Sequence, residues 1–190
     1  MLFLPKPKLS EFDLIIERLK PQHDPLLKAF RCDKEDETDF IRNDALLQQT
    51  IKLNETYLLF ERGKEKVISY ITFSVGSFVL SPEREVYGVR IRDKPCEFPN
   101  RVPCMLIGRL ATDKGEEGRG GASYLLAFAV REAVRKSELV PFPFLAVHAY
   151  PDKVAFYERN GFERAFTPDA GETPRTACMY VGLFDVAKKH

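Results

Sequence analysis

The sequence predicts one mixed α/β domain over residues 1–190, with a central, mainly antiparallel sheet of six or seven strands and about four helices. Three observations predict this fold class. The chain has 190 residues, 44% of them hydrophobic and 30% charged, as expected for a single globular domain. Apolar and β-branched runs dominate its first part. An alternation of strand, helix and strand follows, and its first helix carries a regular helical period.

The first half of the chain predicts a strand, a helix and a hairpin. An apolar run predicts a short strand at 12–19. Acidic residues ahead of an apolar spacing predict a helix near 36–53, because carboxylates in a first turn complement the helix dipole. Strand-forming runs at 56–60 and 67–80, joined by a turn sequence, predict an antiparallel hairpin. Prolines and charges over 81–103 predict a long irregular connection.

The second half predicts strand, helix, strand, helix and strand. A buried strand is expected at 102–112, and a helix over 120–137 has apolar residues at i, i+3, i+4 and i+7. A strand at 144–149, a short helix at 153–160 and a last strand at 176–183 complete the chain. The strands on either side of the long helix should run parallel, because a helical crossover joins them.

Composition excludes several classes of protein. Lys and Arg total 29 and Asp and Glu total 28, so the net charge of +1 does not favour nucleic acid or membrane. No run of 18 uncharged apolar residues is present, and we expect a cytoplasmic protein without signal peptide or membrane span. His148 has no metal-spaced partner, so we interpret it as a structural histidine and expect no metal site. The cysteines form no C-x-x-C pair and are expected to be buried, reduced thiols: Cys32, Cys96, Cys104 and Cys178.

A glycine-rich loop opens the long helix. Gly118, Gly120 and Gly121 lie at the helix start, where backbone N–H groups and the helix dipole favour an anion such as pyrophosphate, and Arg119 would add a cation. Taken alone, the three glycines also fit a flexible turn. The Walker pattern is absent, and Ser123 breaks the dinucleotide pattern G-x-G-x-x-G, which disfavours nucleoside triphosphate hydrolysis and NAD binding.

Three segments together carry a known pattern: a strand ending 110–113, the loop Glu117–Ala122, and Phe156–Phe162 with its aromatic pair before Gly-Phe. This pattern, over residues 105–183, resembles the GNAT superfamily of acetyl-coenzyme A-dependent N-acetyltransferases. Its hallmark is [Q/R]-x-x-G-x-[G/A] at the start of a long helix. The sequence departs from it at Glu117, where Gln or Arg is usual. A carboxylate beside a pyrophosphate predicts weaker coenzyme binding.

The resemblance implies a set of site residues. Tyr157 would protonate the departing thiolate as general acid; the alternative is an aromatic side chain that only packs in the core. In this fold the two strands flanking the long helix splay apart, and the pantetheine of acetyl-CoA pairs with the free strand edge. The backbone N–H near Leu110 would polarise the thioester carbonyl. The coenzyme-binding residues so implied are Leu110, Ala111, Thr112, Glu117, Gly118, Arg119, Gly120, Gly121, Ala122 and Phe156.

Softer features resemble the branch that includes the acetyltransferase toxins of toxin–antitoxin pairs, which acetylate the amine of aminoacyl-tRNA. One feature is the sequence Gly-Arg-Leu-Ala at the strand end, residues 108–111. Another is the pair Phe30 and Cys32 ahead of a helix that contains residues 39–42, and the third is Tyr57 at the start of the hairpin. The resemblance implies an antitoxin and a second copy of the chain as further partners. It also implies that Arg109 contacts the acceptor or tRNA; the alternative is an ordinary strand-end charge.

A tRNA acceptor would need a cationic surface, for which we expect Arg109, Arg119 and Arg159, with the acidic helix at 33–44 facing away. The acceptor must attack as a free amine. An α-amine with a pKa near 7.7–8.0 is partly neutral at pH 7.5, whereas a lysine amine near 10.4 is not. No convincing base is present, which favours an α-amine. The alternatives are a small amine, a protein N-terminus, or a domain that binds coenzyme A without catalysis.

Overall fold

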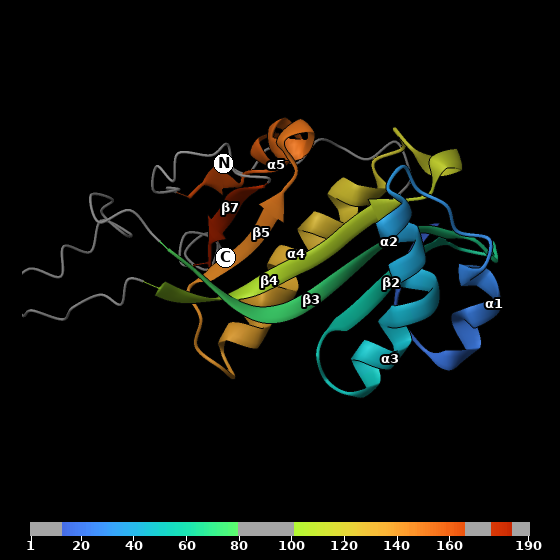
Figure 1. The fold of residues 1–190 in the computed structure, drawn as a ribbon, viewed down its shortest axis with the longest axis horizontal. Coiled ribbons are helices and arrows are strands. Elements are labelled where there is room, and N and C mark those ends of the chain that lie inside the picture. Colours follow the sequence, from blue (N-terminus) through green and yellow to red (C-terminus); the bar gives the residue numbers. More distant parts are fainter. Residues whose placement is uncertain (1–12, 80–100, 166–175, 184–190) are drawn as a thin grey trace, which may run out of the picture. The chain divides into compact units, whose positions relative to one another are not determined.

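The computed structural model describes residues 13–79, 101–165 and 176–183. Its seven strands form one sheet in the order β1-β2-β3-β4-β5-β7-β6, which confirms the predicted fold class (Figure 1). The described residues divide into two compact units. The N-terminal unit comprises 13–74 and 107–128, and the C-terminal unit comprises the rest.

The N-terminal unit contains the predicted hairpin. The hairpin consists of β2 (Glu55–Glu61) and β3 (Val67–Val79), most of which lies in this unit, and β1 (Leu14–Arg18) pairs with β2. Both pairings are antiparallel, so that Leu14 lies opposite Glu61 and Tyr57 opposite Ile71. Gly63 has a φ of 77° in the turn between β2 and β3, a conformation that glycine adopts without steric cost.

The predicted helix near 36–53 is confirmed in place but is not continuous. It consists of α2 (Glu35–Asp39), a π-helical turn at Phe40–Asp44 and α3 (Ala45–Thr50). As predicted, its first turn is acidic, with Glu35, Asp36 and Glu37. A shorter helix, α1 (Asp24–Leu27), precedes it. The sequence analysis did not predict α1, because four residues are too few to show helical periodicity.

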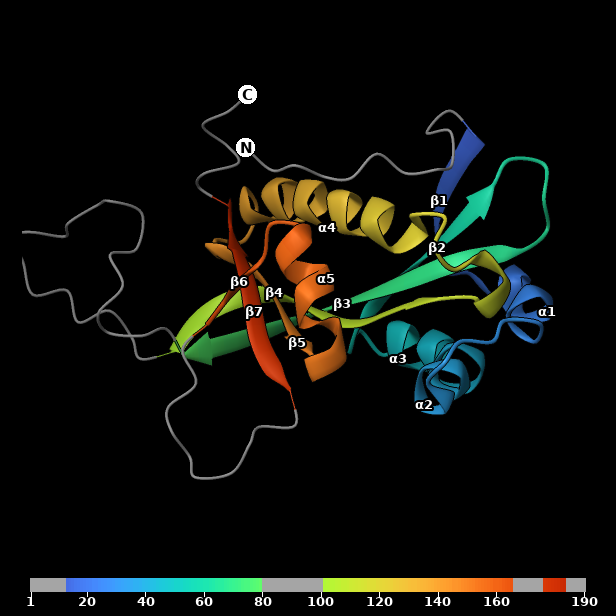
Figure 2. The same ribbon diagram turned by 90° about the horizontal axis from the view of Figure 1, so that it is seen from above.

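Helices cover both faces of the hairpin in the N-terminal unit (Figures 1 and 2). On one face, residues of α1, the π-helical turn and α3 pack on β2 and β3 in a buried cluster that includes Phe40, Leu58 and Tyr70. On the other face, Tyr57 contacts Phe73 and Phe128, the latter from the first half of α4 (Gly121–Ser137). The alternation of side chains along each strand places these two sets on opposite faces.

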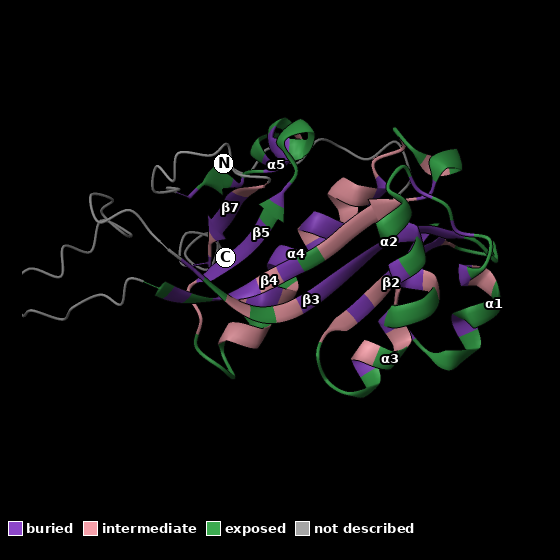
Figure 3. Cartoon of the chain, viewed as in Figure 1, coloured by how far each residue is buried: buried purple, intermediate pink, exposed green. Residues whose placement is uncertain are grey.

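The C-terminal unit is built on a second antiparallel set. β5 (Phe144–Ala149) pairs with β7 (Ala177–Gly182), which pairs with the two-residue β6 (Glu163–Arg164). The short helix α5 (Val154–Arg159) follows β5. β5, β7 and α5 confirm the predictions, whereas β6 is too short for the sequence pattern to indicate. The core of this unit contains the stacked rings of Phe78 and Tyr180. Most residues of β5 and β7 are buried and are purple in Figure 3.

Two details differ from the sequence-based expectations. Strand β4 (Arg101–Thr112) includes Pro103, which we expected in the irregular connection; most of that connection, 80–100, lies outside the described residues. Pro103 is exposed. Proline has no backbone N–H, so a strand tolerates it only at a position where that N–H is not needed for a ladder hydrogen bond. His148 is exposed on β5, and the buried histidine of the described chain is His23, whose ring lies 5.6 Å from that of Phe60.

The described cysteines are buried free thiols, as expected. Burial raises the pKa of Cys104 to about 12 and that of Cys178 to about 11, so both stay protonated and unreactive at neutral pH. Cys32 is also buried, and Cys96 lies outside the described residues. None of the helices in the described part of the chain is long and apolar enough to cross a membrane.

Candidate coenzyme-binding site

Asp113, the first residue after β4, anchors the start of the glycine loop. Its backbone N–H donates to the Ile68 carbonyl of β3 over 2.9 Å, which continues the ladder past the end of the strand. Its carboxylate accepts hydrogen bonds from the Arg31 N–H at 3.0 Å and the Gly115 N–H at 3.1 Å, and it lies 3.0 Å from Lys66 Nζ. One buried carboxylate therefore joins three segments that are distant in sequence.

These contacts determine the ionisation of Asp113. Desolvation by burial alone would raise the pKa of its carboxyl group. The hydrogen bonds from Arg31, Lys66 and Gly115 favour the charged form and outweigh that effect, so the pKa of Asp113 lies below its ordinary value. The side chain is thus a carboxylate at any physiological pH.

The loop after Asp113 has the shape of an anion cradle. Gly118 and Gly120 have φ values of 70° and 93°, in the left-handed region that favours glycine. Helix α4 begins at Gly121, and Tyr124 N–H makes the first hydrogen bond of this turn, to the Gly120 carbonyl at 3.0 Å. The N–H groups of residues 121–123 precede it and point out of the helix end, where they can donate to a phosphate.

The glycines differ in what a side chain would meet. A Cβ at Gly118 would have no heavy atom within 4 Å, so this side of the loop is open. A Cβ at Gly121 would lie 2.7 Å from Ser69 Oγ and 3.1 Å from Ile68 Cγ2. Gly121 therefore allows the helix to approach β3 closely, while the open side at Gly118 leaves room for a ligand.

The remaining predicted coenzyme residues of this unit lie around the loop. Leu110, Ala111 and Thr112 are half-buried at the end of β4, and Thr112 Oγ1 lies 2.8 Å from Ser69 Oγ. Ala122 is half-buried in the first turn of α4, and Glu117 is exposed. The effect of Glu117 on coenzyme binding stays a prediction.

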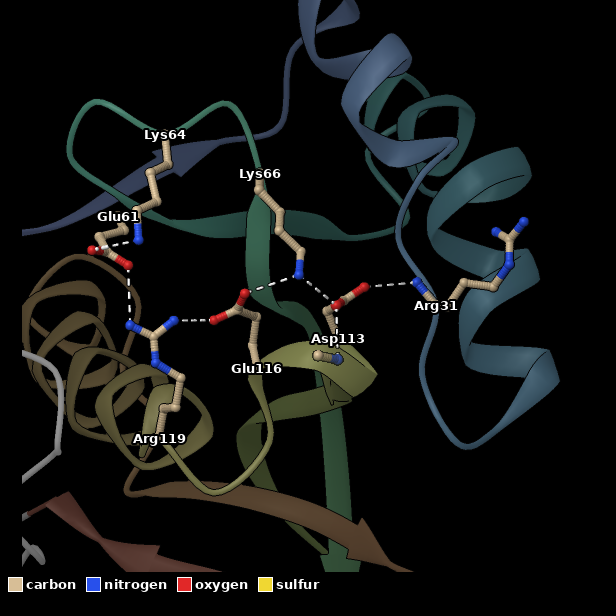
Figure 4. A network of polar contacts seen from close by, with 8 residues as sticks. Arg31, Glu61, Lys64, Lys66, Asp113, Glu116 and Arg119 are labelled. Carbon is tan, nitrogen blue, oxygen red and sulfur yellow. Dashed lines mark hydrogen bonds and ion pairs between the residues drawn. The ribbon is translucent and has the colours of Figure 1, made fainter.

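Arg119 takes part in a chain of ion pairs around the loop (Figure 4). Its guanidinium contacts Glu116 and lies 3.1 Å from Glu61 Oε2 at the end of β2. Glu61 also pairs with Lys64 at 2.9 Å. Lys66 bridges Glu116 at 2.9 Å and Asp113 at 3.0 Å. Arg119 is thus engaged by two carboxylates of the protein itself.

Arg109 lies in a second polar cluster, together with the acidic helix. Its guanidinium is 3.2 Å from Glu37 Oε1 and 3.7 Å from Asp36 Oδ2, and it lies 4.4 Å from the centre of the Phe40 ring. The buried Tyr70 hydroxyl is 2.8 Å from the other oxygen of Glu37, to which it donates. Burial and the Glu37 carboxylate raise the pKa of Tyr70, which keeps this donor protonated.

This cluster corrects one expectation from the sequence. We expected the acidic helix to face away from Arg109, but Glu37 and Asp36 of α2 contact it directly. The physical reason is that Arg109 is only one-third exposed, so its charge needs a nearby counterion. The carboxylates of α2 supply that counterion.

Tyr157 and Phe156 belong to the C-terminal unit. Tyr157 is buried in α5, where its ring lies 5.2 Å from Phe156 and 5.5 Å from Phe162. Arg159 is exposed at the end of the same helix. The role of Tyr157 as general acid stays a prediction. No group of His, Cys, Asp and Glu in the described residues could hold a metal ion.

Comparison with known proteins identifies the family. Residues 23–162 match the model of the acetyltransferase (GNAT) family, and this match covers most of the chain, so the protein belongs to that family. A tRNA-acetylating toxin from Mycobacterium tuberculosis is 39% identical over 67 residues, which are 35% of this chain and 40% of that protein. The match therefore spans less than half of the length of this curated relative.

Solved structures share the fold. A mutant of KacT superposes with a TM-score of 0.76 at 21% identity, over 94% of this chain and 99% of that one. AtaT complexed with acetyl-methionyl-tRNAfMet gives 0.74 at 24% identity, over 93% and 99%. AtaTR bound with acetyl-CoA gives 0.72 at 24% identity, over 94% and 98%. The chain is thus similar in fold to toxin acetyltransferases.

Sequence reasoning missed several residues of these clusters. Asp113 had a usable signal, because a carboxylate between a strand and a glycine loop is well placed to accept loop N–H groups. Glu61, Lys66, Glu37 and Tyr70 had none, since each lies far along the chain from the residue that it contacts.

The Arg109 cluster yields a stability prediction. Arg109→Ala leaves the largely buried Glu37 carboxylate without its cation, so we expect the free energy of unfolding to fall by about 1–2 kcal/mol. Urea denaturation of both proteins measures the change. The double variant Arg109→Ala/Glu37→Gln should recover part of the loss, because the uncompensated charge is gone. Equal loss in both variants would contradict the ion-pair explanation.

A second prediction concerns acid. Because the pKa of Asp113 is lowered by folding, its carboxylate stabilises the fold fully above the unfolded pKa, near 4, and this stabilisation is lost as the pH falls through the folded value. The variant Asp113→Asn should therefore be less stable than the wild type at pH 7. It should also lose less stability than the wild type between roughly pH 5 and pH 3, where the Asp113 carboxyl of the wild type takes up its proton. Urea unfolding at a series of pH values measures both slopes. Parallel curves would refute the assignment.

Proposed function

We propose that this protein is an acetyl-CoA-dependent N-acetyltransferase that transfers acetyl to the α-amine of aminoacyl-tRNA. The observation that carries the proposal is the loop of Gly118–Gly121, whose open side and helix-end N–H groups suit the pyrophosphate of coenzyme A. Membership of the acetyltransferase family supports acetyl-CoA as the donor.

The proposed reaction is direct transfer. The neutral amine attacks the thioester carbonyl carbon, a C–N bond forms, the C–S bond breaks and the amine loses a proton to water. The Tyr157 hydroxyl gives its proton to the coenzyme thiolate as it leaves. In a regular strand the backbone N–H groups of successive residues point to opposite edges. The Asp113 N–H points to β3, so the N–H of Leu110, three residues earlier, should point to the other edge of β4. This direction supports Leu110 N–H as the donor that polarises the carbonyl.

The acceptor is proposed from two lines of argument. An α-amine needs no strong base, as its pKa lies near 7.7–8.0. In addition, the relatives include a protein named as a tRNA-acetylating toxin and a solved complex of AtaT with acetyl-methionyl-tRNAfMet. Small amines and protein N-termini remain the alternative acceptors, and coenzyme binding without catalysis is the alternative function, motivated by Glu117.

The expected tRNA surface of Arg109, Arg119 and Arg159 stays a prediction, and we propose to extend it. Arg109 and Arg119 are engaged by carboxylates, so we propose that other cations contact tRNA phosphates. Arg31 and Lys114 are exposed and adjacent, since Lys114 N–H donates to the Arg31 carbonyl at 2.8 Å. Lys114 Nζ lies 3.9 Å from one oxygen of Asp33, but both side chains are 60% exposed, so solvent screens this pair strongly. Arg109 is retained as an acceptor-side residue that acts together with Glu37. A cytoplasmic location, an antitoxin and a second copy of the chain belong to the same proposal.

Tyr157→Phe tests the general acid. The substitution keeps the packed ring and removes only the hydroxyl, so we expect turnover to fall by about 10²–10⁴-fold. A coupled thiol assay measures the rate. As control, acetyl-CoA should raise the melting temperature of the variant as it does that of the wild type. A loss of less than about threefold would reject the role, since a positioned acid contributes far more.

The acceptor is tested by comparing charged tRNA with a panel of small amines at several salt concentrations. Transfer to tRNA should weaken steeply with salt, because each phosphate contact releases counterions, and Arg31→Ala/Lys114→Ala should make that dependence shallower. Transfer to small amines should depend little on salt. Transfer only to small amines would overturn the tRNA proposal, and no transfer despite acetyl-CoA binding would favour the non-catalytic alternative.

A further inference from the structure

Arg119 lies between two glycines of the coenzyme loop, residues 115–121. Gly118 and Gly120 flank it, with φ values of 70° and 93°. Glycine populates many backbone conformations and loses more entropy on ordering than any other residue. The two glycines therefore allow the turn but do not hold it in one shape. A side chain between them that binds to the rest of the protein would do so.

The Arg119 side chain makes such contacts. Its guanidinium lies 3.1 Å from Glu61 Oε2 and also contacts Glu116 (Figure 4). Glu61 ends β2, and Glu116 ends the short helical turn at Lys114–Glu116. The carboxylate side chains are 21% and 12% exposed and the Arg119 side chain is 36% exposed, so the carboxylates are partly shielded from solvent while the guanidinium is not. The planar guanidinium fork suits two carboxylates at once.

The charge balance of this network is neutral. Its cations are Lys64, Lys66 and Arg119, and each is paired with one or two of the carboxylates Glu61, Asp113 and Glu116. Two carboxylates balance the charge of Arg119, so a phosphate that approached its remaining N–H groups would meet little net positive charge. The network thus gives Arg119 little surplus charge to offer a ligand.

We propose that Arg119 is a positioning residue, which holds the coenzyme loop through Glu61 and Glu116 and does not itself bind the phosphates. The ligand would then be bound by backbone N–H groups that are already aimed before it arrives, which lowers the ordering cost of binding. This inference rests on the proposed function for the identity of the ligand, acetyl-CoA. It reverses the role that the glycine pattern alone assigns to Arg119.

Glu61→Gln gives results of opposite sign for the two roles. If Arg119 positions the loop, loss of its partner loosens the loop, and the dissociation constant of acetyl-CoA should rise about three- to tenfold. If Arg119 is a phosphate ligand restrained by Glu61, the same variant frees it and the dissociation constant should fall. Calorimetric titration measures both. A fall, or no change, overturns the proposal.

Lys64→Gln is the matched control. Lys64 contacts the same Glu61 carboxylate, at 2.9 Å, but lies in the β2–β3 turn and not in the loop. Its removal changes the local charge without touching the contacts of Arg119. We expect acetyl-CoA affinity to stay unchanged in this variant. General electrostatics instead predicts tighter binding in Glu61→Gln and weaker binding in Lys64→Gln, because the two substitutions remove opposite charges, and that outcome would overturn the proposal.

Arg119→Lys separates shape from charge. A lysine keeps the cation and serves well as a point charge for a phosphate, but it cannot form the fork to two carboxylates. The proposal expects the KM for acetyl-CoA to rise while kcat at saturation and the melting temperature change little. It also expects no added loss when Arg119→Lys is combined with Glu61→Gln. Wild-type affinity in Arg119→Lys would contradict it.

A ligand-free measurement keeps the two proposals distinguishable. Amide hydrogen exchange of peptides covering 115–123 should be faster in Glu61→Gln and Arg119→Lys than in the wild type and Lys64→Gln, because the loop opens more often. If the wild type does not bind acetyl-CoA, the proposed function fails, and exchange alone decides the role of Arg119. Unchanged exchange in all variants overturns the positioning role.

Discussion

The carboxylate of Asp113 is the interaction on which the N-terminal unit depends most. It is buried at the end of β4 and accepts hydrogen bonds from the N–H groups of Gly115, in its own loop, and of Arg31. Arg31 precedes the acidic helix α2 in the chain. Lys66 adds the cation that makes the burial of this charge tolerable. A neutral side chain at 113 would leave these donors with fewer acceptors. The strand end, the glycine loop and the segment that leads to α2 are therefore fixed by one charge.

Placing the loop by ion pairs has a consequence for recognition. The cations near the loop are balanced by carboxylates, so under the proposed function the attraction for a phosphate would come from the N–H groups at the start of α4 and from the helix dipole. A loop of this kind depends on its shape, and the close packing of Gly121 on Ser69 helps to define that shape.

The elements that could be predicted are those with a local signal. The helical period of α4, the hairpin and the glycine loop are each visible within one window of sequence, and they occur where predicted. The pairing of Arg119 with Glu61 joins residues 58 positions apart, and no local pattern indicates it. The π-helical turn between α2 and α3 was equally invisible, because the apolar spacing on both sides fits an ordinary helix.

The pairing of Arg109 with Glu37 also bears on the chemistry of an amine acceptor. A carboxylate near an amine favours its ammonium form, which cannot attack a thioester. Arg109 compensates the charge of Glu37 at 3.2 Å, and the Tyr70 hydroxyl occupies the other oxygen. Under the proposed function, the acidic helix would then not raise the pKa of an α-amine bound nearby. The same ion pair that stabilises the packing of α2 would thus keep the acceptor partly neutral without a dedicated base.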